Sequence, residues 1–420
     1  MAEVLPLRAL RYELAAVGGL DRVAAPPYDV IDEPERAALA GRSPYNVVHV
    51  DLPRAPDGGD PYAHAAELLG AWRADGALVR DDGPALWALA QDFEAPDGRR
   101  HTRRSFLCRV RVEEYGPGRV RPHERTHPGP REDRLRLTRA TRTNLSPIFS
   151  LFPDQAGAAW AALEPATRAD PWDVYTDGEG TRQRIWPVRD EAAIAAVRAV
   201  LAPAELLIAD GHHRYETARV YAEEVGGEGE HEYVLMCLCS LSDPGLTVFP
   251  THRLLSGLDD ERRVALRDAL LRDFEPAEVG LDELEPPAGG ALPAFGYLDA
   301  HHRRPMRLTL RDGAIADRAL AGRPEPYRRL DTAVLEALVL RDALGMSEDD
   351  VAHFRGLGYA RTVADARAAL DEGRAQAAFF LAPTPVEQVR EVAATGESMP
   401  PKSTYFFPKI PTGLLFNPLA

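Results

Sequence analysis

The segment Asp210-Gly211-His212-His213-Arg214 combines residue types that handle phosphate, and it follows a short apolar run. Gly211 permits the positive φ of a tight turn, and a helix beginning after it would direct its positive amino end at an anion. His212, His213 and Arg214 suit phosphate oxygens, and His213 is also a candidate catalytic group. Asp210 is a candidate catalytic residue and metal ligand, because it could bind Mg²⁺ or orient an acceptor hydroxyl. The structural alternative is a helix capped by Asp210 with solvated histidines.

A second polar segment lies among prolines, between residues 121 and 134. His123 and Glu124 are candidate catalytic bases, and Arg125 and Thr126 are candidates for binding phosphate. Prolines restrict the backbone here, and a rigid polar loop on a folded scaffold is a common place for function. The alternative is a solvated surface loop.

The chain contains only two lysines, and both lie near its end. Lys402 precedes Ser403 and Thr404, and the ammonium and hydroxyl groups of this triplet suit phosphate contacts. Lys409 is the weaker candidate of the two lysines. Three consecutive aromatic residues follow the triplet, so we expect this tail to dock on the body of the protein. A structural tail with lysines at its rim is the alternative.

Two further segments contain histidine next to arginine. His252 and Arg253 follow Thr251 at the end of a predicted strand and are candidates for binding phosphate, with a structural role as the alternative. The segment 299–303 has nearly the residue types of 210–214, but it lacks the glycine and lies between two predicted strands. We therefore expect an exposed hairpin turn there.

Composition limits the classes of function. The net charge is −15 and the pI is near 5.3, which argues against binding of duplex DNA. With 27% charged and 45% hydrophobic residues, 420 residues suit roughly two or three globular domains. The three cysteines are expected to be buried core thiols. No signal peptide is visible, and the longest apolar stretch, 233–241, is too short to span a bilayer, so a cytoplasmic protein is expected.

The elements that would position these residues alternate between strands and helices. Strands are expected at 45–50, 85–93, 102–112, 185–188, 205–209, 233–241, 246–255, 295–298, 305–310 and 377–381. Helices are expected at 62–74, 191–201, 332–344, 363–372 and 386–394, with others ending near 141 and 225. This order predicts a mixed α and β fold with an N-terminal region 1–115, a central module 116–256 and a C-terminal region 257–420.

Seven blocks of the sequence resemble the bacterial and archaeal family called domain of unknown function 1015. The blocks are 25–31 (APPYDVI), 43–46 (SPYN), 123–126 (HERT), 144–148 (NLSPI), 209–217 (ADGHHRYET), 250–253 (PTHR) and 401–406 (PKSTYF). The Asp-Gly-His-His-Arg element is also similar to the phosphate-binding element of the ParB and sulfiredoxin superfamily. That superfamily includes nucleotide-binding partition proteins and archaeal free-serine kinases.

This second resemblance implies a ParB/sulfiredoxin-like central module in which residues 211–214 contact nucleotide phosphates. Sulfiredoxin has a reactive cysteine in the element where this chain has histidine, so thiol repair is not expected. We therefore expect a nucleotide-dependent phosphotransferase or phosphate-handling enzyme that uses Mg²⁺ and acts on a small metabolite, with serine or phosphoserine as implied substrates. The alternative is a non-catalytic nucleotide- or metabolite-binding regulatory protein. A single site requires the polar segments around Glu124, Asp210 and Lys402 to converge.

Overall fold

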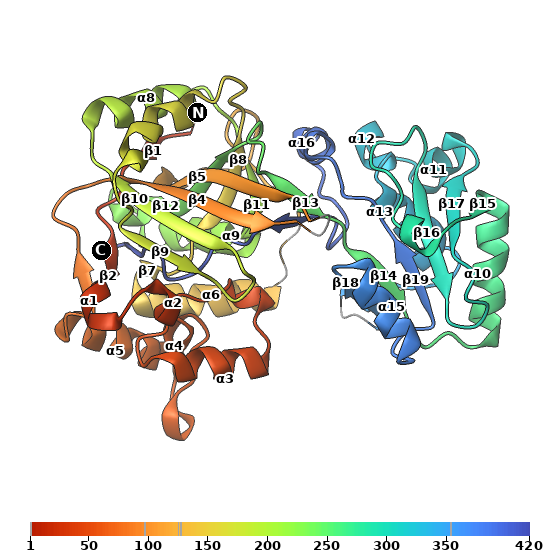
Figure 1. Ribbon diagram of the computed structural model, residues 1–420, viewed down its shortest axis with the longest axis horizontal. Coiled ribbons are helices and arrows are strands. Elements are labelled where there is room, and N and C mark those ends of the chain that lie inside the picture. The colour runs from red at the N-terminus through yellow and green to blue at the C-terminus, as the bar shows by residue number, and fades with distance from the viewer. Residues whose placement is uncertain (1, 96–97, 125, 127, 353–354) are drawn as a thin grey trace. The chain divides into compact units, whose positions relative to one another are not determined.

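A nine-stranded mixed sheet is the centre of the first of two units into which the chain divides in the computed structural model (Figure 1). The structure describes residues 2–95, 98–124, 126, 128–352 and 355–420. Unit 1 comprises Met1–Pro122, Thr126–Leu246 and Pro408–Ala420, and unit 2 comprises His123–Arg125 and Thr247–Phe407. The three-part division expected from the sequence stays a prediction, because a grouping by contacts does not test which segments fold independently.

The sheet of unit 1 has the order β6-β11-β8-β12-β5-β4-β10-β9, and β1 also pairs with β5. Its strands are β1 (Val4–Leu5), β4 (Leu86–Glu94), β5 (Arg100–Arg111), β6 (Val120–Arg121), β8 (Ile148–Phe152), β9 (Asp173–Thr176), β10 (Arg182–Val188), β11 (Leu206–Asp210) and β12 (Tyr233–Ser240). Most neighbours are antiparallel, but β12 runs parallel to β8, and β11 runs parallel to β6. The strands expected at 85–93 and 102–112 are confirmed as β4 and β5, which pair antiparallel.

Helices cover both faces of this sheet (Figure 1). On one face, α7 (Ala158–Leu163) and α8 (Glu191–Leu201) bury Leu163, Val197 and Leu201 in the main apolar core. The N-terminal helices lie across the other side. They are α1 (Leu14–Val17), α2 (Leu20–Val23), α3 (Glu33–Arg42), α4 (Val48–Asp51) and α5 (Pro61–Ala74). The remaining helices of unit 1 are α6 (Pro128–Thr141) and α9 (His212–Val225).

Unit 2 is built on a six-stranded antiparallel sheet with the order β15-β17-β16-β19-β14-β18. Its strands are β14 (His252–Leu255), β15 (Phe274–Glu278), β16 (Ala294–Asp299), β17 (Met306–Leu310), β18 (Leu357–Ala360) and β19 (Ala377–Phe380), and a separate pair joins β13 (Thr247–Phe249) to β20 (Tyr405–Phe407). Its helices include α10 (Asp260–Asp273), α11 (Gly313–Ala319), α13 (Asp331–Leu335), α15 (Val363–Asp371) and α16 (Val386–Ala394). Residues 299–303 join β16 to β17, so the expected hairpin turn is confirmed.

The observed elements confirm the mixed α and β class that the sequence predicted. Cys108, Cys237 and Cys239 are buried and unpaired, as expected. In the part of the chain that the structure describes, no helix is both long enough and apolar enough to cross a bilayer. The strand expected at 45–50 is wrong: Asn46 accepts a hydrogen bond from the Val48 backbone N–H at 3.0 Å, and the chain turns into α4. A side chain that bonds to nearby backbone in this way competes with strand pairing.

Candidate functional site

The turn at Gly211 joins β11 directly to α9, as the sequence predicted. Gly211 has φ +94°, and a Cβ atom placed there would lie 2.9 Å from Arg214 Nε. Only glycine satisfies both conditions, because other residues are strained at positive φ and carry a Cβ. Glycine also has no side chain to cap the helix. The amino end of α9 therefore presents backbone rather than a capping carboxylate, which is an arrangement that favours anions.

Asp210 is held between two cations. Its Oδ2 accepts a hydrogen bond from Arg214 Nη2 at 2.5 Å, and its Oδ1 accepts one from Lys409 Nζ at 2.5 Å. Burial alone would raise the pKa of Asp210, but the charges of Lys409 and Arg214 outweigh it and hold the pKa well below its usual range. Asp210 is therefore ionised at neutral pH, and it is a better orienting group than proton acceptor.

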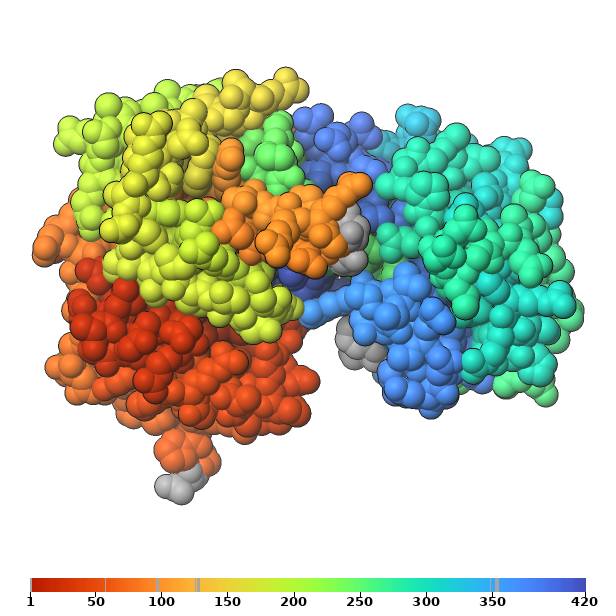
Figure 2. All heavy atoms as spheres, viewed as in Figure 1, coloured from red at the N-terminus to blue at the C-terminus, as the bar shows by residue number. Residues whose placement is uncertain are grey.

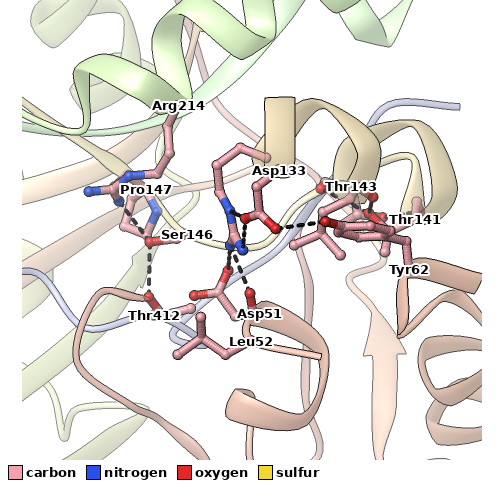
Figure 3. Close-up of polar contacts among 12 residues, drawn as sticks. Asp51, Leu52, Tyr62, Asp133, Thr141, Thr143, Ser146, Pro147, Arg214 and Thr412 are labelled. Carbon is pink, nitrogen blue, oxygen red and sulfur yellow. Dashed lines mark hydrogen bonds and ion pairs between the residues drawn. The ribbon is translucent and has the colours of Figure 1, made fainter. Parts of the chain in front are cut away.

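Arg214 is fixed by neighbours from two other segments (Figure 3). Its Nη1 donates to Ser146 Oγ at 2.7 Å and to the carbonyl of Pro147, and Thr412 Oγ1 donates to Ser146 Oγ at 2.9 Å. The Arg214 side chain is only 10% exposed, and its Nε is buried without a hydrogen-bond partner in the described part of the chain. A buried donor without an acceptor costs stability, so this group is suited to an added acceptor.

A third cation, Arg103, is fully buried close to the same turn. It donates to Gln91 Oε1 and to the carbonyl of Pro408, and its guanidinium lies 4.5 Å from the centre of the Phe149 ring. Within the described ranges Arg103 has no ion pair, and its Nη1 has no hydrogen-bond partner. Burial lowers the pKa of Arg103, although Asp210 is among the charges that oppose this shift. A buried cation without a paired anion is costly, so the site favours an added anion.

A second buried pair lies near Arg214 and joins α6 to α4 (Figure 3). Arg134 Nη1 donates to Asp51 Oδ1 at 3.0 Å, and its guanidinium lies 4.2 Å from the centre of the Tyr28 ring. Burial raises the pKa of Asp51, and Arg134 and Arg214 both oppose the rise. Tyr28 belongs to the APPYDVI block, so this block contributes to the surroundings of Arg214.

A separate group of the predicted residues meets in unit 2. His123 Nε2 lies 2.9 Å from Thr404 Oγ1, and the His123 carbonyl accepts from the Met399 backbone N–H. Ser403 is buried, and its hydroxyl donates to Thr332 Oγ1 at 3.0 Å. The structure therefore brings the HERT and PKSTYF blocks together, although they are far apart in the sequence.

Three other predicted residues of unit 2 have distinct environments. Lys402 is exposed and has φ +56°, an uncommon conformation for a residue other than glycine. Arg253 is buried, donates to the carbonyls of Thr251 and Pro401, and lies over the Tyr359 ring. His252 is fully buried, and its Nδ1 accepts from the Leu381 backbone N–H at 3.2 Å. Burial, helped by the charge of Arg253, lowers the pKa of His252 to about 4.

The predicted site residues thus form two groups. Asp210 to Arg214 lie in unit 1, as does Thr126, whereas His123, Glu124, His252, Arg253 and residues 402–404 lie in unit 2. Arg125 lies outside the described residues. Convergence of both groups into one site stays a prediction, and so do the individual catalytic and binding roles. Among the described residues no group of three or more His, Cys, Asp or Glu side chains could hold a metal ion.

Sequence reasoning missed Arg103 and ranked Lys409 below Lys402. A signal for Arg103 was present, because it lies opposite Gln91 in the pairing of the two expected strands 85–93 and 102–112, where both side chains are buried. Two large polar side chains that face each other in the buried part of a sheet are unusual. The contact between Lys409 and Asp210 spans 199 residues and had no local signal beyond the rarity of lysine.

The chain is thus a mixed α and β protein whose candidate site is the glycine-containing turn between β11 and α9, with several cationic side chains near it. The chain belongs to the family described as "Protein of unknown function (DUF1015)", whose model matches residues 4–333. The block 401–406 lies beyond that match. No curated protein matches the chain.

Solved structures show a distant likeness. A conserved hypothetical protein from Pyrococcus furiosus is 16% identical, with a TM-score of 0.35, over 70% of this chain and 89% of that one. A free serine kinase in complex with AMP is 16% identical, with a TM-score of 0.36, over 70% and 88%. SbnI with a C-terminal truncation, from Staphylococcus aureus, is 11% identical, with a TM-score of 0.37, over 74% and 86%. At these TM-scores the likeness carries no argument about the site.

Proposed function

We propose that the protein binds a nucleotide through its phosphates at the Gly211 turn and transfers a phosphoryl group to a small metabolite. The observation that carries this proposal is the excess of buried positive charge at the turn. Arg103, Arg214 and Lys409 surround it, and Asp210 is the carboxylate that pairs with two of them. Phosphoryl transfer depends on positioning and charge neutralisation more than on covalent chemistry, and this arrangement supplies both.

The buried donors define what each residue would do. Arg103 Nη1 and Arg214 Nε have unused donor capacity, which phosphate oxygens would fill. The amino end of α9 would add backbone donors and a favourable dipole. Asp210 would hold Mg²⁺ together with the substrate phosphates, since this ion commonly takes only one or two protein carboxylates in such sites.

In the transfer step, the hydroxyl oxygen of the acceptor would form a bond to the terminal phosphorus of the nucleotide. The bond from that phosphorus to the bridging oxygen would break, and the shortened nucleotide would leave with the electron pair. Asp210 would orient the hydroxyl, whose proton would leave to solvent as the new bond forms. His213 is placed next to the turn as a second candidate for this proton. The resemblance to free-serine kinases makes serine and phosphoserine the first metabolites to test.

Phosphorus NMR tests this function directly. ATP, ADP, CTP and pyrophosphate are each incubated with Mg²⁺ and the protein, with and without serine, and new phosphate resonances are followed. We expect transfer by the wild type and by Asp282→Asn, which removes an exposed carboxylate of unit 2, and at least a hundredfold slower transfer by Asp210→Asn. Absence of transfer and of binding with every donor would contradict the proposal.

A regulatory protein that binds a nucleotide or metabolite is the second candidate. Both carboxylate oxygens of Asp210 are already engaged by cations, which suits a binding site that performs no chemistry. Binding with no transfer by the wild type, and equal binding by Asp210→Asn, would support this reading. Participation of the unit 2 group is tested separately with Glu124→Gln, which should bind a nucleotide normally but transfer phosphate slowly if Glu124 acts in catalysis.

A further inference from the structure

A cavity of about 710 Å³ lies in unit 2, where α10 packs beside β15 (Figure 1). Its floor consists of side chains that four neighbouring strands direct to one face of the sheet: Pro276, Met306, Leu308, Tyr297, Asp299 and Ala377. All but Asp299 are apolar or aromatic, so the floor is mainly hydrophobic. Small-molecule sites commonly have volumes of about 300–1,000 Å³ and linings of this kind.

The same face of the sheet is closed at its other end. Phe274, Phe295 and Phe379 lie on this face and are fully buried, and the Phe295 ring contacts the other two. Over the cavity, by contrast, Met306 and Tyr297 are only partly buried. The apolar face therefore extends beyond the part that the fold covers, and uncovered apolar surface of this kind marks sites of interaction.

α10 adds exposed apolar side chains to the wall of the cavity. Val264 is 48% exposed and Leu271 is 55% exposed, and their spacing of seven residues places them on the same side of the helix. A single exposed apolar residue is common on a protein surface, but two that share one side of a helix and one cavity form a patch. The cavity is therefore apolar on both its helix side and its sheet side.

Two arginines of α10 place positive charge in the same wall. Arg263 and Arg267 both line the cavity, and they are neighbours on the helix because four residues separate them. Each side chain is more than half exposed and pairs with a carboxylate of its own helix, Asp260 or Asp268. Exposed ion pairs of this kind contribute little to stability, so both guanidinium groups are able to turn to an anion in the cavity.

The turn between β16 and β17 supplies further hydrogen-bond donors. His301 and His302 line the cavity, and a histidine ring always carries at least one N–H group. Residues 301–304 are exposed, and this part of the chain forms teal spheres on the surface of unit 2 in Figure 2. Of the two carboxylates in the lining, Asp299 accepts from the backbone N–H groups of both histidines, and Asp260 is 99% exposed. The carboxylate of Asp299 is thus engaged within its own turn.

From this arrangement we infer that the cavity binds an amphipathic anion, namely a carboxylate with an unbranched hydrocarbon chain of medium length. The chain would lie between α10 and the sheet, and the carboxylate would accept hydrogen bonds from Arg263 and Arg267, whose forked donors match its two oxygens. At roughly 30 Å³ for each water-sized group, the cavity has ample room for a ten-carbon carboxylate. This site would be additional to the Gly211 turn, which belongs to unit 1.

Binding is tested by titration calorimetry with decanoate, hexanoate and decylamine on the full chain. Decylamine has the chain length of decanoate but a positive head group, which the net charge of −15 on the protein would favour without any specific site. Tighter binding of decanoate than of decylamine, by at least tenfold, is therefore expected only if the arginines of the cavity bind the head group. Each buried methylene strengthens binding about fourfold, so hexanoate should bind at least tenfold more weakly than decanoate.

The double variant Arg263→Gln/Arg267→Gln tests the head-group contact. It should weaken decanoate binding at least tenfold, because two charge-assisted hydrogen bonds are lost. Arg329→Gln/Arg374→Gln is the matched control, since it removes two similarly exposed arginines of unit 2 that do not line the cavity, and it should leave binding unchanged.

The double variant Val264→Ser/Leu271→Ser tests the contact with the hydrocarbon chain. Both side chains are exposed in the ligand-free protein, so the fold should remain intact while decanoate binding weakens about tenfold. Leu281→Ser changes a similarly exposed leucine of unit 2 outside the cavity and should leave binding unchanged.

Three results would overturn the inference. The first is no binding of decanoate, or equal binding of decanoate and decylamine. The second is decanoate binding that Arg263→Gln/Arg267→Gln leaves at the wild-type level. The third comes from sedimentation velocity: a wild-type dimer that Val264→Ser/Leu271→Ser converts to monomer would assign the apolar cavity to a second copy of the chain.

Discussion

Gly211→Ala changes one atom at the turn and should disturb the whole cation cluster. The new Cβ would lie 2.9 Å from Arg214 Nε and 3.0 Å from its Cζ, so the guanidinium has to move. Positive φ costs an alanine about 1–2 kcal/mol. Displacing Arg214 from Asp210 or Ser146 costs a charge-assisted hydrogen bond of about 1.5–3 kcal/mol. We therefore expect a loss of about 2.5–5 kcal/mol in the free energy of unfolding of unit 1.

Gly227→Ala is the matched control. Gly227 lies just after the same helix with φ +73°, and a Cβ there would meet no atom within 4 Å. This variant carries the cost of positive φ alone, about 1–2 kcal/mol. The difference between the two variants isolates the displacement of Arg214.

Urea unfolding followed by tryptophan fluorescence measures both variants. All five tryptophans lie in unit 1, so the signal reports this unit. In the same variants, ATP affinity should fall at least tenfold for Gly211→Ala and stay unchanged for Gly227→Ala. Equal destabilisation by the two substitutions, or normal ATP binding by Gly211→Ala, would refute the argument that this turn positions Arg214 for phosphate.

Three further outcomes follow from the same contacts. The depressed pKa of Asp210 stabilises the fold at every pH above about 3.9, the usual value for Asp, and this contribution is lost as the pH falls below it. In Lys409→Met the pKa of Asp210 in the fold should rise, so the urea midpoint should fall less between about pH 4 and pH 2.5 than in the wild type, and an equally steep decline would be contrary evidence. His252 has a pKa of about 4 in the fold and about 6.5 when unfolded, so the free energy of unfolding of unit 2 should fall by about 3 kcal/mol as the pH drops from 6.5 to 4. His252→Gln should flatten this decline in thermal melts followed by circular dichroism, and identical pH profiles for the two proteins would show that His252 is not its cause. Gly296→Ala would place a Cβ 1.8 Å from the Leu284 carbonyl oxygen, so it should unfold unit 2 at markedly lower urea concentration, and wild-type stability would show that the loop before β16 can move freely.

Local features of the candidate site could be predicted from the sequence. The apolar run before Asp210 predicts a strand and the glycine after it predicts a turn, and the structure has β11, the turn and α9 at these positions. In the aromatic segment that follows the 402–404 triplet, β20 pairs with β13 and Phe406 is buried. These predictions succeed because hydrophobic alternation and backbone freedom are set by neighbouring residues.

Partners across the fold could not be predicted in the same way. Asp210 meets Lys409 because the last residues of the chain return to unit 1, and no pattern near either residue records this. The alternation at 45–50 indicated a strand, but the Asn46 side chain bonds to the backbone of Val48, Arg22 and Ala24 and favours a helical turn. In both cases the local structure depends on a polar or long-range contact, and the hydrophobic periodicity of the sequence gives no information about such contacts.

Calorimetric titration of ATP into Arg103→Met tests the central claim most directly, with Arg100→Met as its control on the same strand. Arg103 is fully buried in the cluster, whereas the Arg100 side chain is 90% exposed. We predict that the wild type and Arg100→Met bind ATP with the same dissociation constant and that Arg103→Met binds at least tenfold more weakly, because a buried charge-assisted hydrogen bond to phosphate is lost. Equal binding by all three proteins, or no ATP binding by the wild type, would contradict a phosphate site at this turn.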